Sequence, residues 1–184
     1  EIPLRLVGSE MCIRDRFRLN DYAEEVFAYS QENDIPVAME ILDIDYFKEY
    51  NDNYGHQEGD RCLVSIANTI CNLVEEAEGF CARYGGDEFV IIYANVTREQ
   101  AVSFAEELRR RVLALEMEHR FSKALPVVTI SQGVCWGIPR KGNRRWDFLH
   151  AADNMLYRVK KFSRNNYCVG GLDETEDVTM GTTL

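Results

Sequence analysis

Apolar residues recur along this chain with two spacings, one typical of helices and the other typical of strands. Recurrence every three or four residues predicts amphipathic helices at residues 17–31, 62–74, 97–115 and 147–161. Continuous or alternating apolar and β-branched residues predict strands at residues 37–44, 80–82, 89–93 and 127–136, and a closing strand at 164–169. The 184 residues, 46% of them apolar, are enough to bury one core, so we expect a single domain.

Polar residues mark where some of these elements should begin. Thr97, with Gln100 three residues later, predicts a capping box at the start of a helix. Residues 51–60 are rich in turn formers and predict a loop before the helix at 62–74, where Asp60 could serve as the N-cap.

The two ends of the chain lack such a pattern. Residues 1–16 mix proline, glycine and alternating charges, so we expect an irregular segment, and its resemblance to translated adapter sequence would make it artefactual. Residues 172–184 contain an acidic, apolar-poor run and predict a disordered tail or a linker. The domain itself should span residues 17–171.

The charge balance narrows the classes of partner. Lys and Arg number 21 against 31 Asp and Glu, and the net charge of −10 argues against broad binding to nucleic acid or to an anionic membrane. No apolar run approaches the roughly 20 residues of a membrane-spanning helix, so we expect a soluble, cytoplasmic fragment. The six cysteines are scattered, which favours core positions over a zinc site or a disulfide framework. Any phosphate-binding site must therefore be local.

Gly85 and Gly86 lie between two strand-like runs, a pattern that predicts a tight hairpin because glycine accepts positive φ. Asp87 and Glu88 follow at once, beside residues without side chains, where a ligand can approach the backbone. Carboxylates in this place can hold a divalent metal, although a solvated turn would have the same local sequence.

Asp43 interrupts a strand that otherwise reads as buried, and a short helix is expected directly after it. If the two strands are neighbours, Asp43 would join Asp87 and Glu88 in a cluster of like charges that needs cations, which is a magnesium-site hypothesis. Lys48, and Lys160, Lys161 and Arg164 near the end of the last helix, could meet a triphosphate. A solubilising helix end that favours the helix dipole is the simpler interpretation of the last three.

Together these residues resemble the GGDEF family of diguanylate cyclases over roughly residues 16–169. The resemblance is carried by Arg83-Tyr84-Gly85-Gly86-Asp87-Glu88-Phe89, Leu42-Asp43-Ile44-Asp45-Tyr46-Phe47-Lys48, Asn51-Asp52-Asn53-Tyr54-Gly55-His56, Gly59-Asp60, and Ala152-Asp153 with Tyr157 and Lys160. It implies an α/β (α+β) fold similar to nucleotide-cyclase and polymerase palm domains, with a mostly antiparallel five-stranded sheet flanked by helices. It also implies that two GTP condense to cyclic di-GMP with release of two pyrophosphates.

The resemblance implies a role for each matching residue. Asp43 and Asp87 would hold Mg²⁺ or Mn²⁺ through their side chains and Ile44 through its carbonyl, and Glu88 would be a further ligand. The base that takes the proton from the attacking 3′-hydroxyl is either Asp87 or Glu88.

The other matching residues would bind the nucleotide. Phe47 and Lys48 match the loop that wraps the phosphates, Lys160 and Arg164 match the cations that close over it, and Gly85 and Gly86 leave room for the ligand. Asn51 and Asp60 match the guanine contacts, and a carboxylate can accept from N1–H and N2–H₂ of guanine, an edge that adenine lacks. This edge favours GTP over ATP.

Two departures from the family pattern change what we expect. Residues 9–16 stand where members carry D-x-L-T-G-L-x-N-R, and only Arg16 matches. Glu76 and Gly79 occupy the places of an inhibitory R-x-x-D motif, and acidic residues there would repel an anionic dinucleotide, so we expect no inhibitory product site.

The motifs supply one half-site per chain, so turnover should require a transient homodimer, controlled in a full-length protein by an upstream sensory or receiver domain. Two alternatives stay open. The chain could be a GTP-binding regulatory module with weak catalysis that acts through a partner domain, or a palm-like domain for another nucleotide.

Overall fold

The computed structural model describes residues 16–172 and 178–182, with side chains from residue 18 onward. The helices are α1 (Arg16–Asn33), α2 (Phe47–Tyr54), α3 (His56–Glu76), α4 (Arg98–Leu113) and α5 (Arg145–Phe162). The strands are β1 (Val37–Ile44), β2 (Phe80–Gly85), β3 (Glu88–Ala94), β4 (Ile130–Gly137), β5 (Tyr167–Gly170) and β6 (Thr179–Met180). None of the described helices has the length and apolar character needed to cross a membrane.

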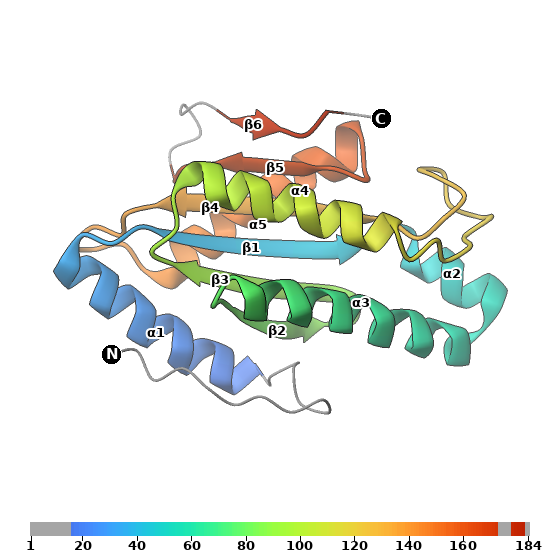
Figure 1. The fold of residues 1–184 in the computed structure, drawn as a ribbon, viewed down its shortest axis with the longest axis horizontal. Coiled ribbons are helices and arrows are strands. Elements are labelled where there is room, and N and C mark those ends of the chain that lie inside the picture. The colour runs from blue at the N-terminus through green and yellow to red at the C-terminus, as the bar shows by residue number, and fades with distance from the viewer. Residues whose placement is uncertain (1–15, 173–177, 183–184) are drawn as a thin grey trace.

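The strands form one sheet in the order β2-β3-β1-β4-β5-β6, with β1 at its centre (Figure 1). All neighbouring pairs are antiparallel except β4 and β5, which are parallel. This arrangement confirms the predicted α/β class and its mostly antiparallel sheet. The sheet has six strands instead of the predicted five, because Thr179 and Met180 pair with β5. At these two residues the expected disordered tail or linker is a strand, whereas the acidic run at 173–177 lies outside the described residues.

Helices cover both faces of the sheet, because alternate residues of β1 point to opposite sides. On one face Ala38, Leu42 and Ile44 pack in a core with apolar residues of α3 and α4. On the other, Val37, Met39 and Ile41 pack with residues of α1 and α5. Figure 1 shows α3 and α4 in front of the sheet and α5 behind it. All eight residues of β1 are buried, as a central strand between two helical layers requires.

The turn-rich stretch at 51–60 is helical, which corrects the predicted loop. Helix α2 continues to Tyr54, Gly55 adopts a φ of 84°, and α3 begins at His56. One glycine with positive φ is enough to separate the helices, and the asparagines and aspartates around it face outward on helical turns. Asp60 therefore lies inside α3, and its interpretation as an N-cap is wrong.

The capping box predicted for α4 is confirmed. The Thr97 side chain accepts from the Gln100 amide, and the Gln100 side chain accepts from the Thr97 amide. The predicted core positions of the cysteines are also confirmed for the five in the described part of the chain, all buried and unbridged; Cys12 lies outside the described residues.

Glu40 is a buried acid in the middle of the central strand. Its side chain is 1% exposed, and Oε1 has no hydrogen-bond partner among the described residues. Burial disfavours the charged form and raises the pKa of Glu40 from its ordinary value of 4.5 to about 8. The folded state therefore keeps a proton on Glu40 at neutral pH, which the unfolded chain has lost.

This difference predicts that stability falls as the pH rises. The stabilisation that the neutral Glu40 gives to the folded state is fully present below pH 4.5, and it is lost as the pH rises toward about 8. By neutral pH the free energy of unfolding has fallen by ~3 kcal/mol. We expect Glu40→Gln to remove most of the decline above pH 6, where the raised pKa of Asp43, about 6, no longer contributes. Urea unfolding from pH 5 to 8 measures this, with the exposed Glu25→Gln as the matched control. An unchanged decline in Glu40→Gln would show that the carboxyl is not the source.

Candidate functional site

The carboxylates predicted to hold a metal come from two neighbouring strands. Asp43 stands near the end of β1, directly opposite Glu88, the first residue of β3. Cross-strand partners in an antiparallel pair point to the same face, so the two side chains project from one side of the sheet. Asp87 lies in the turn just before Glu88, close enough for its charge to raise the pKa of Asp43. The fold thus brings the three predicted carboxylates to one end of the central strands.

The hairpin between β2 and β3 has the tight form that its glycines predict. Gly85 pairs with Glu88, which leaves Gly86 and Asp87 as the turn. Gly86 has a φ of 52°, and its carbonyl accepts from Arg83 Nε at 2.8 Å. No atom lies within 4 Å of the place where a Cβ on Gly86 would stand. The turn therefore presents the backbone of Gly86 to open space, next to the half-buried Asp87.

A cation from α5 faces these acids. Lys160 Nζ lies 2.8 Å from Asp43 Oδ2. The pKa of Asp43 is raised to about 6. Burial is the largest cause, the hydrogen bond and charge of Lys160 act in the opposite direction, and the charges of Asp87 and Asp45 add to the rise. Lys160 is thus the counter-ion that keeps a partly buried carboxylate charged near neutral pH.

The donors at this place fit a divalent metal only in part. Within the described residues, no group of three or more His, Cys, Asp and Glu side chains is arranged to hold a metal ion. Mg²⁺ usually takes one or two carboxylates and completes its shell with water and phosphate oxygens. The Asp43 and Asp87 carboxylates and the Ile44 carbonyl fit such a site, provided that Lys160 gives up its place on Asp43.

The turn from β1 into α2 is held by Asp45, which the sequence analysis did not single out. Asp45 is 0% exposed and accepts from Thr129 Oγ1 and Ser131 Oγ at 2.7 Å each, from the Asn165 amide at 2.9 Å and from Arg164 Nη1 at 3.2 Å. The Arg164 guanidinium also lies 4.3 Å from the Tyr46 ring centroid. Arg164 is thus held at Asp45, two residues after the Asp43 that pairs with Lys160.

The two predicted guanine contacts come from adjacent helices. Gly59 packs against Asn51 so closely that a Cβ on Gly59 would stand 1.8 Å from Asn51 Oδ1. Asp60 follows Gly59 and is exposed, and Asn51 is half-buried. Gly59 was noted only as part of a motif, and the structure gives its physical role: it makes room for the Asn51 amide.

The two predicted residues of the phosphate loop face different surroundings. The Phe47 side chain is buried in the core, so only its backbone is available to a ligand, whereas Lys48 is exposed.

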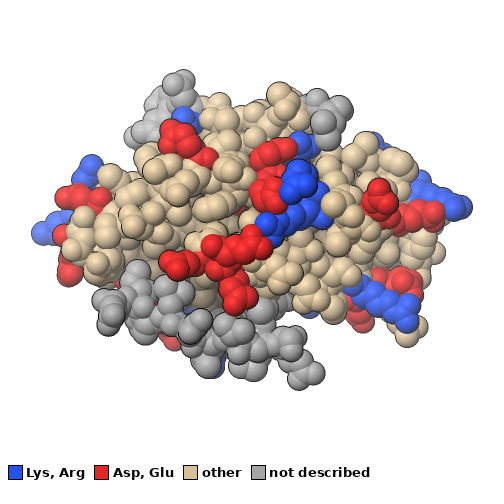
Figure 2. All heavy atoms as spheres, in the orientation of Figure 1, with Lys and Arg blue, Asp and Glu red and all other residues tan. Residues whose placement is uncertain are grey.

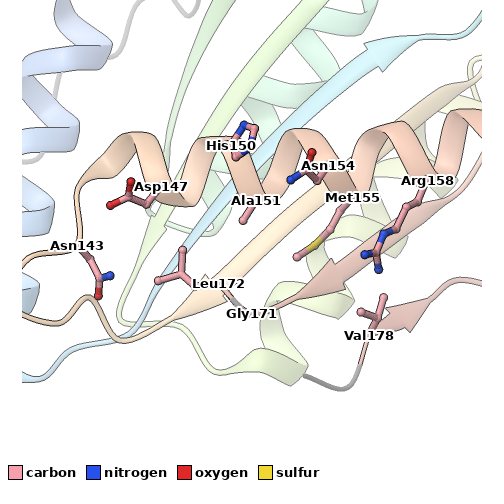
Figure 3. Close-up of a pocket in the computed structure, with 10 residues that line it drawn as sticks. All are labelled: Asn143, Asp147, His150, Ala151, Asn154, Met155, Arg158, Gly171, Leu172 and Val178. Carbon is pink, nitrogen blue, oxygen red and sulfur yellow. The ribbon is translucent and has the colours of Figure 1, made fainter. Parts of the chain in front are cut away.

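A pocket of about 470 Å³ lies elsewhere, between α5 and the residues that follow β5 (Figure 3). Its lining comprises Asn143, Asp147, His150, Ala151, Asn154, Met155, Arg158, Gly171, Leu172 and Val178, so none of the predicted site residues contributes to it. The candidate site is an open junction at the strand ends, not this pocket.

The sheet order and the covering helices define an α/β domain of the GGDEF fold. The crystal structure of the coiled coil and GGDEF domain of DgcB from Caulobacter crescentus in complex with c-di-GMP is similar, with a TM-score of 0.77 and 28% identity. The likeness covers 86% of this chain and 82% of that one. The family model described as diguanylate cyclase, GGDEF domain, matches residues 12–166, and the chain therefore belongs to this family.

Curated relatives agree with this assignment. Diguanylate cyclase VdcA of Vibrio cholerae is 37% identical over 131 residues, which are 70% of this chain and 38% of VdcA. The bifunctional diguanylate cyclase/cyclic di-GMP phosphodiesterase MucR of Pseudomonas aeruginosa is 32% identical over 167 residues, 91% of this chain and 24% of MucR. The chain spans less than two fifths of the length of either relative.

The ion pair between Lys160 and Asp43 predicts a measurable pKa. Because Lys160 lowers the pKa of Asp43, we expect Lys160→Met to raise it above its present value of about 6. Titration of the Asp43 carboxyl by carbon-detected NMR measures this change. Lys161→Met, at the exposed neighbouring position, is the matched control and should leave the value unchanged. An Asp43 pKa unaffected by Lys160→Met would mean that the ion pair does not form in solution.

Proposed function

We propose that this chain is a diguanylate cyclase domain that condenses two GTP to cyclic di-GMP. The 3′-oxygen of each GTP attacks the α-phosphorus of the other, two phosphodiester bonds form, and two pyrophosphates leave. The observation that carries the proposal is the junction at the end of β1, where Asp43 and the Asp87 turn face Lys160 and Arg164. Family membership supports it, since the relatives include proteins named as diguanylate cyclases.

The acidic half of the junction would hold Mg²⁺ or Mn²⁺. Asp43, Asp87 and the Ile44 carbonyl are the proposed ligands, and Glu88, opposite Asp43, is a further ligand or the base. A bound divalent ion would neutralise phosphate charge and lower the pKa of the attacking hydroxyl. The raised pKa of Asp43, about 6, still leaves most of this carboxylate ionised at pH 7 and able to bind a cation.

The cationic half would bind the triphosphate. Lys160 and Arg164 are held beside the junction by Asp43 and Asp45, at 2.8 Å and 3.2 Å. Lys48 and the backbone N–H groups at the start of α2 face the same ligand. A metal bound to Asp43 would displace Lys160, and the lysine would then be free to bind a phosphate oxygen close by.

Base choice would rest on Asn51 and Asp60. The close contact of Asn51 with Gly59 holds the amide against the residue that precedes Asp60, and the two side chains would offer acceptors to N1–H and N2–H₂ of guanine. Adenine presents no such pair of donors, which is why we propose GTP as the substrate.

The reaction needs two GTP in one site, and each chain offers one half-site. We therefore propose that turnover takes place in a transient homodimer whose half-sites face one another. A longer protein would control this encounter through a further domain upstream.

We also propose that the chain has no inhibitory site for its product, and the charges on the face that carries α3 and α4 support this. Glu76 is bound by Arg111 through two hydrogen bonds of 2.9 and 2.6 Å, and Arg111 also pairs with Glu107 at 2.7 Å. Figure 2 shows basic and acidic side chains next to one another on this face. Arg111 is already paired with two carboxylates and is therefore not available to a phosphate. The acidic Glu76 would repel an anionic cyclic dinucleotide.

The direct test is to incubate the protein with GTP or with ATP in the presence of Mg²⁺ and to measure cyclic di-GMP and pyrophosphate. We expect product from GTP only, a rate that holds as product accumulates, and specific activity that rises with protein concentration. Asp87→Asn should abolish product and retain GTP binding, whereas Asp21→Asn, exposed on α1, should leave turnover unchanged.

Each other result has a distinct meaning. GTP binding without product in the wild type would support the regulatory-module alternative, and product from ATP would support a palm-like domain for another nucleotide. Normal turnover by Asp87→Asn would show that Asp87 is not a ligand of the catalytic metal.

A further inference from the structure

His119 is a buried histidine that the reaction proposed above does not use. It belongs to the segment 117–128, which connects α4 to β4 and closes on itself through a bridge between Glu118 and Val127. The His119 amide donates to the Pro126 carbonyl at 2.9 Å, and its carbonyl accepts from the Ser122 amide at 3.1 Å. The side chain is 0% exposed, so this segment carries the imidazole into the interior.

The imidazole lies against one side of α2. Its ring contacts Tyr50 edge-on, with centroids 5.2 Å apart, and Tyr54 at 6.3 Å. The same segment binds the far end of α2, where the Tyr54 hydroxyl accepts from the Arg120 amide at 3.0 Å. Tyr50 and Tyr54 are four residues apart in α2 and lie in one row along the helix, and the His119 ring meets both.

The contact with Tyr46 involves its backbone. His119 Nε2 lies 3.0 Å from the Tyr46 carbonyl oxygen. A carbonyl can only accept, so Nε2 carries the hydrogen, and Nδ1 is then an acceptor. Nδ1 is buried and has no hydrogen-bond partner among the described residues. A phenylalanine would fill the same space without this unsatisfied atom, so packing alone does not explain a histidine here.

The Tyr46 carbonyl lies at a strained turn, where its position affects the start of α2. Tyr46 has a φ of 57°, a left-handed conformation that a non-glycine residue adopts only when its surroundings enforce it. Its carbonyl also accepts from the Tyr50 amide at 3.0 Å, the first hydrogen bond of α2. The Tyr46 carbonyl and the Phe47 N–H belong to one planar trans peptide and point in opposite directions. Two donors on the carbonyl therefore fix the orientation of this peptide, and with it the direction of the Phe47 N–H, which belongs to the proposed phosphate loop.

We propose that His119 is a positioning residue that sets the phosphate loop through the Tyr46 carbonyl. It touches no substrate; it fixes the strained turn that directs the Phe47 N–H and the start of α2 at the triphosphate. This role rests on the proposed function for its ligand, and its structural half, the restraint on residues 46–50, can be measured without nucleotide.

Two substitutions separate positioning from packing. His119→Phe keeps an aromatic ring between Tyr50 and Tyr54 and removes the donor. His119→Gln keeps an N–H donor near the position of Nε2 and loses the ring. If His119 positions the loop, His119→Phe should be at least as stable as the wild type, while its KM for GTP rises about tenfold, the effect of one lost hydrogen bond, with a smaller change in kcat. His119→Gln should be less stable and keep a KM within about twofold of the wild type.

Backbone amide hydrogen exchange of the protein without nucleotide supplies the second measurement. Exchange of the Tyr50 amide, which donates to the Tyr46 carbonyl, should be about tenfold faster in His119→Phe and near the wild-type rate in His119→Gln, with β1 unchanged in both. A wild-type KM and wild-type exchange in His119→Phe would overturn the proposal, as would a KM that follows stability in the two variants. If the wild type makes no cyclic di-GMP, the proposed function fails, and the exchange comparison still decides whether His119 holds the turn.

Discussion

The burial of acidic side chains at the end of the central strand is the constraint on which the site depends. Asp43 lies near the end of a strand with no exposed residue and Asp45 directly follows it, and both are largely removed from water. Carboxylates in such a place need donors or cations, because an unpaired buried charge is costly. Lys160 is the partner of Asp43, and two hydroxyls, a backbone amide and Arg164 donate to Asp45. Strand β4, helix α5 and the turn after it are therefore tied to one junction.

The same partners give the junction its chemical character. An acid and a lysine 2.8 Å apart form a neutral pair, which either a metal or a phosphate can open. A metal and a phosphate bound together would separate the ion pair without leaving an unpaired charge. The metal would take the place of Lys160 on Asp43, and the phosphate would take the place of Asp43 on Lys160. A nucleotide bound with Mg²⁺ would supply both charges, and this is the physical reason that we propose a nucleotide triphosphate as the ligand instead of a lone anion or a lone cation.

Much of this arrangement follows from the sequence, because it depends on local pattern. The apolar run at 37–44, the hairpin at Gly85 and Gly86 and the Thr97 cap each have a signal within a few residues, and the structure has all three, with Gly86 and Asp87 as the turn of the hairpin. The loop expected at 51–60 was wrong since composition alone does not show that Gly55 is the only break. The sixth strand was missed because two residues of strand carry no periodicity.

The residues that the sequence analysis missed make contacts across long distances in the chain. Asp45 binds Thr129 and Ser131, 84 and 86 residues away, and His119 reaches the Tyr46 carbonyl from 73 residues away. Thr129 and Ser131 alternate along a predicted strand, but nothing in the sequence says which acid they face. Tertiary pairing of this kind becomes visible only when the register of β1 and β4 is known.

The central claim is that the acidic and cationic residues at the end of β1 form a nucleotide site. A crystal structure of the protein with Mg²⁺ and a non-hydrolysable GTP analogue tests it most directly. The account predicts a metal ion on Asp43 and Asp87, Lys160 moved from Asp43 to a phosphate oxygen, and guanine beside Asn51 and Asp60. A nucleotide bound elsewhere, with the 2.8 Å pair of Lys160 and Asp43 intact, would contradict it.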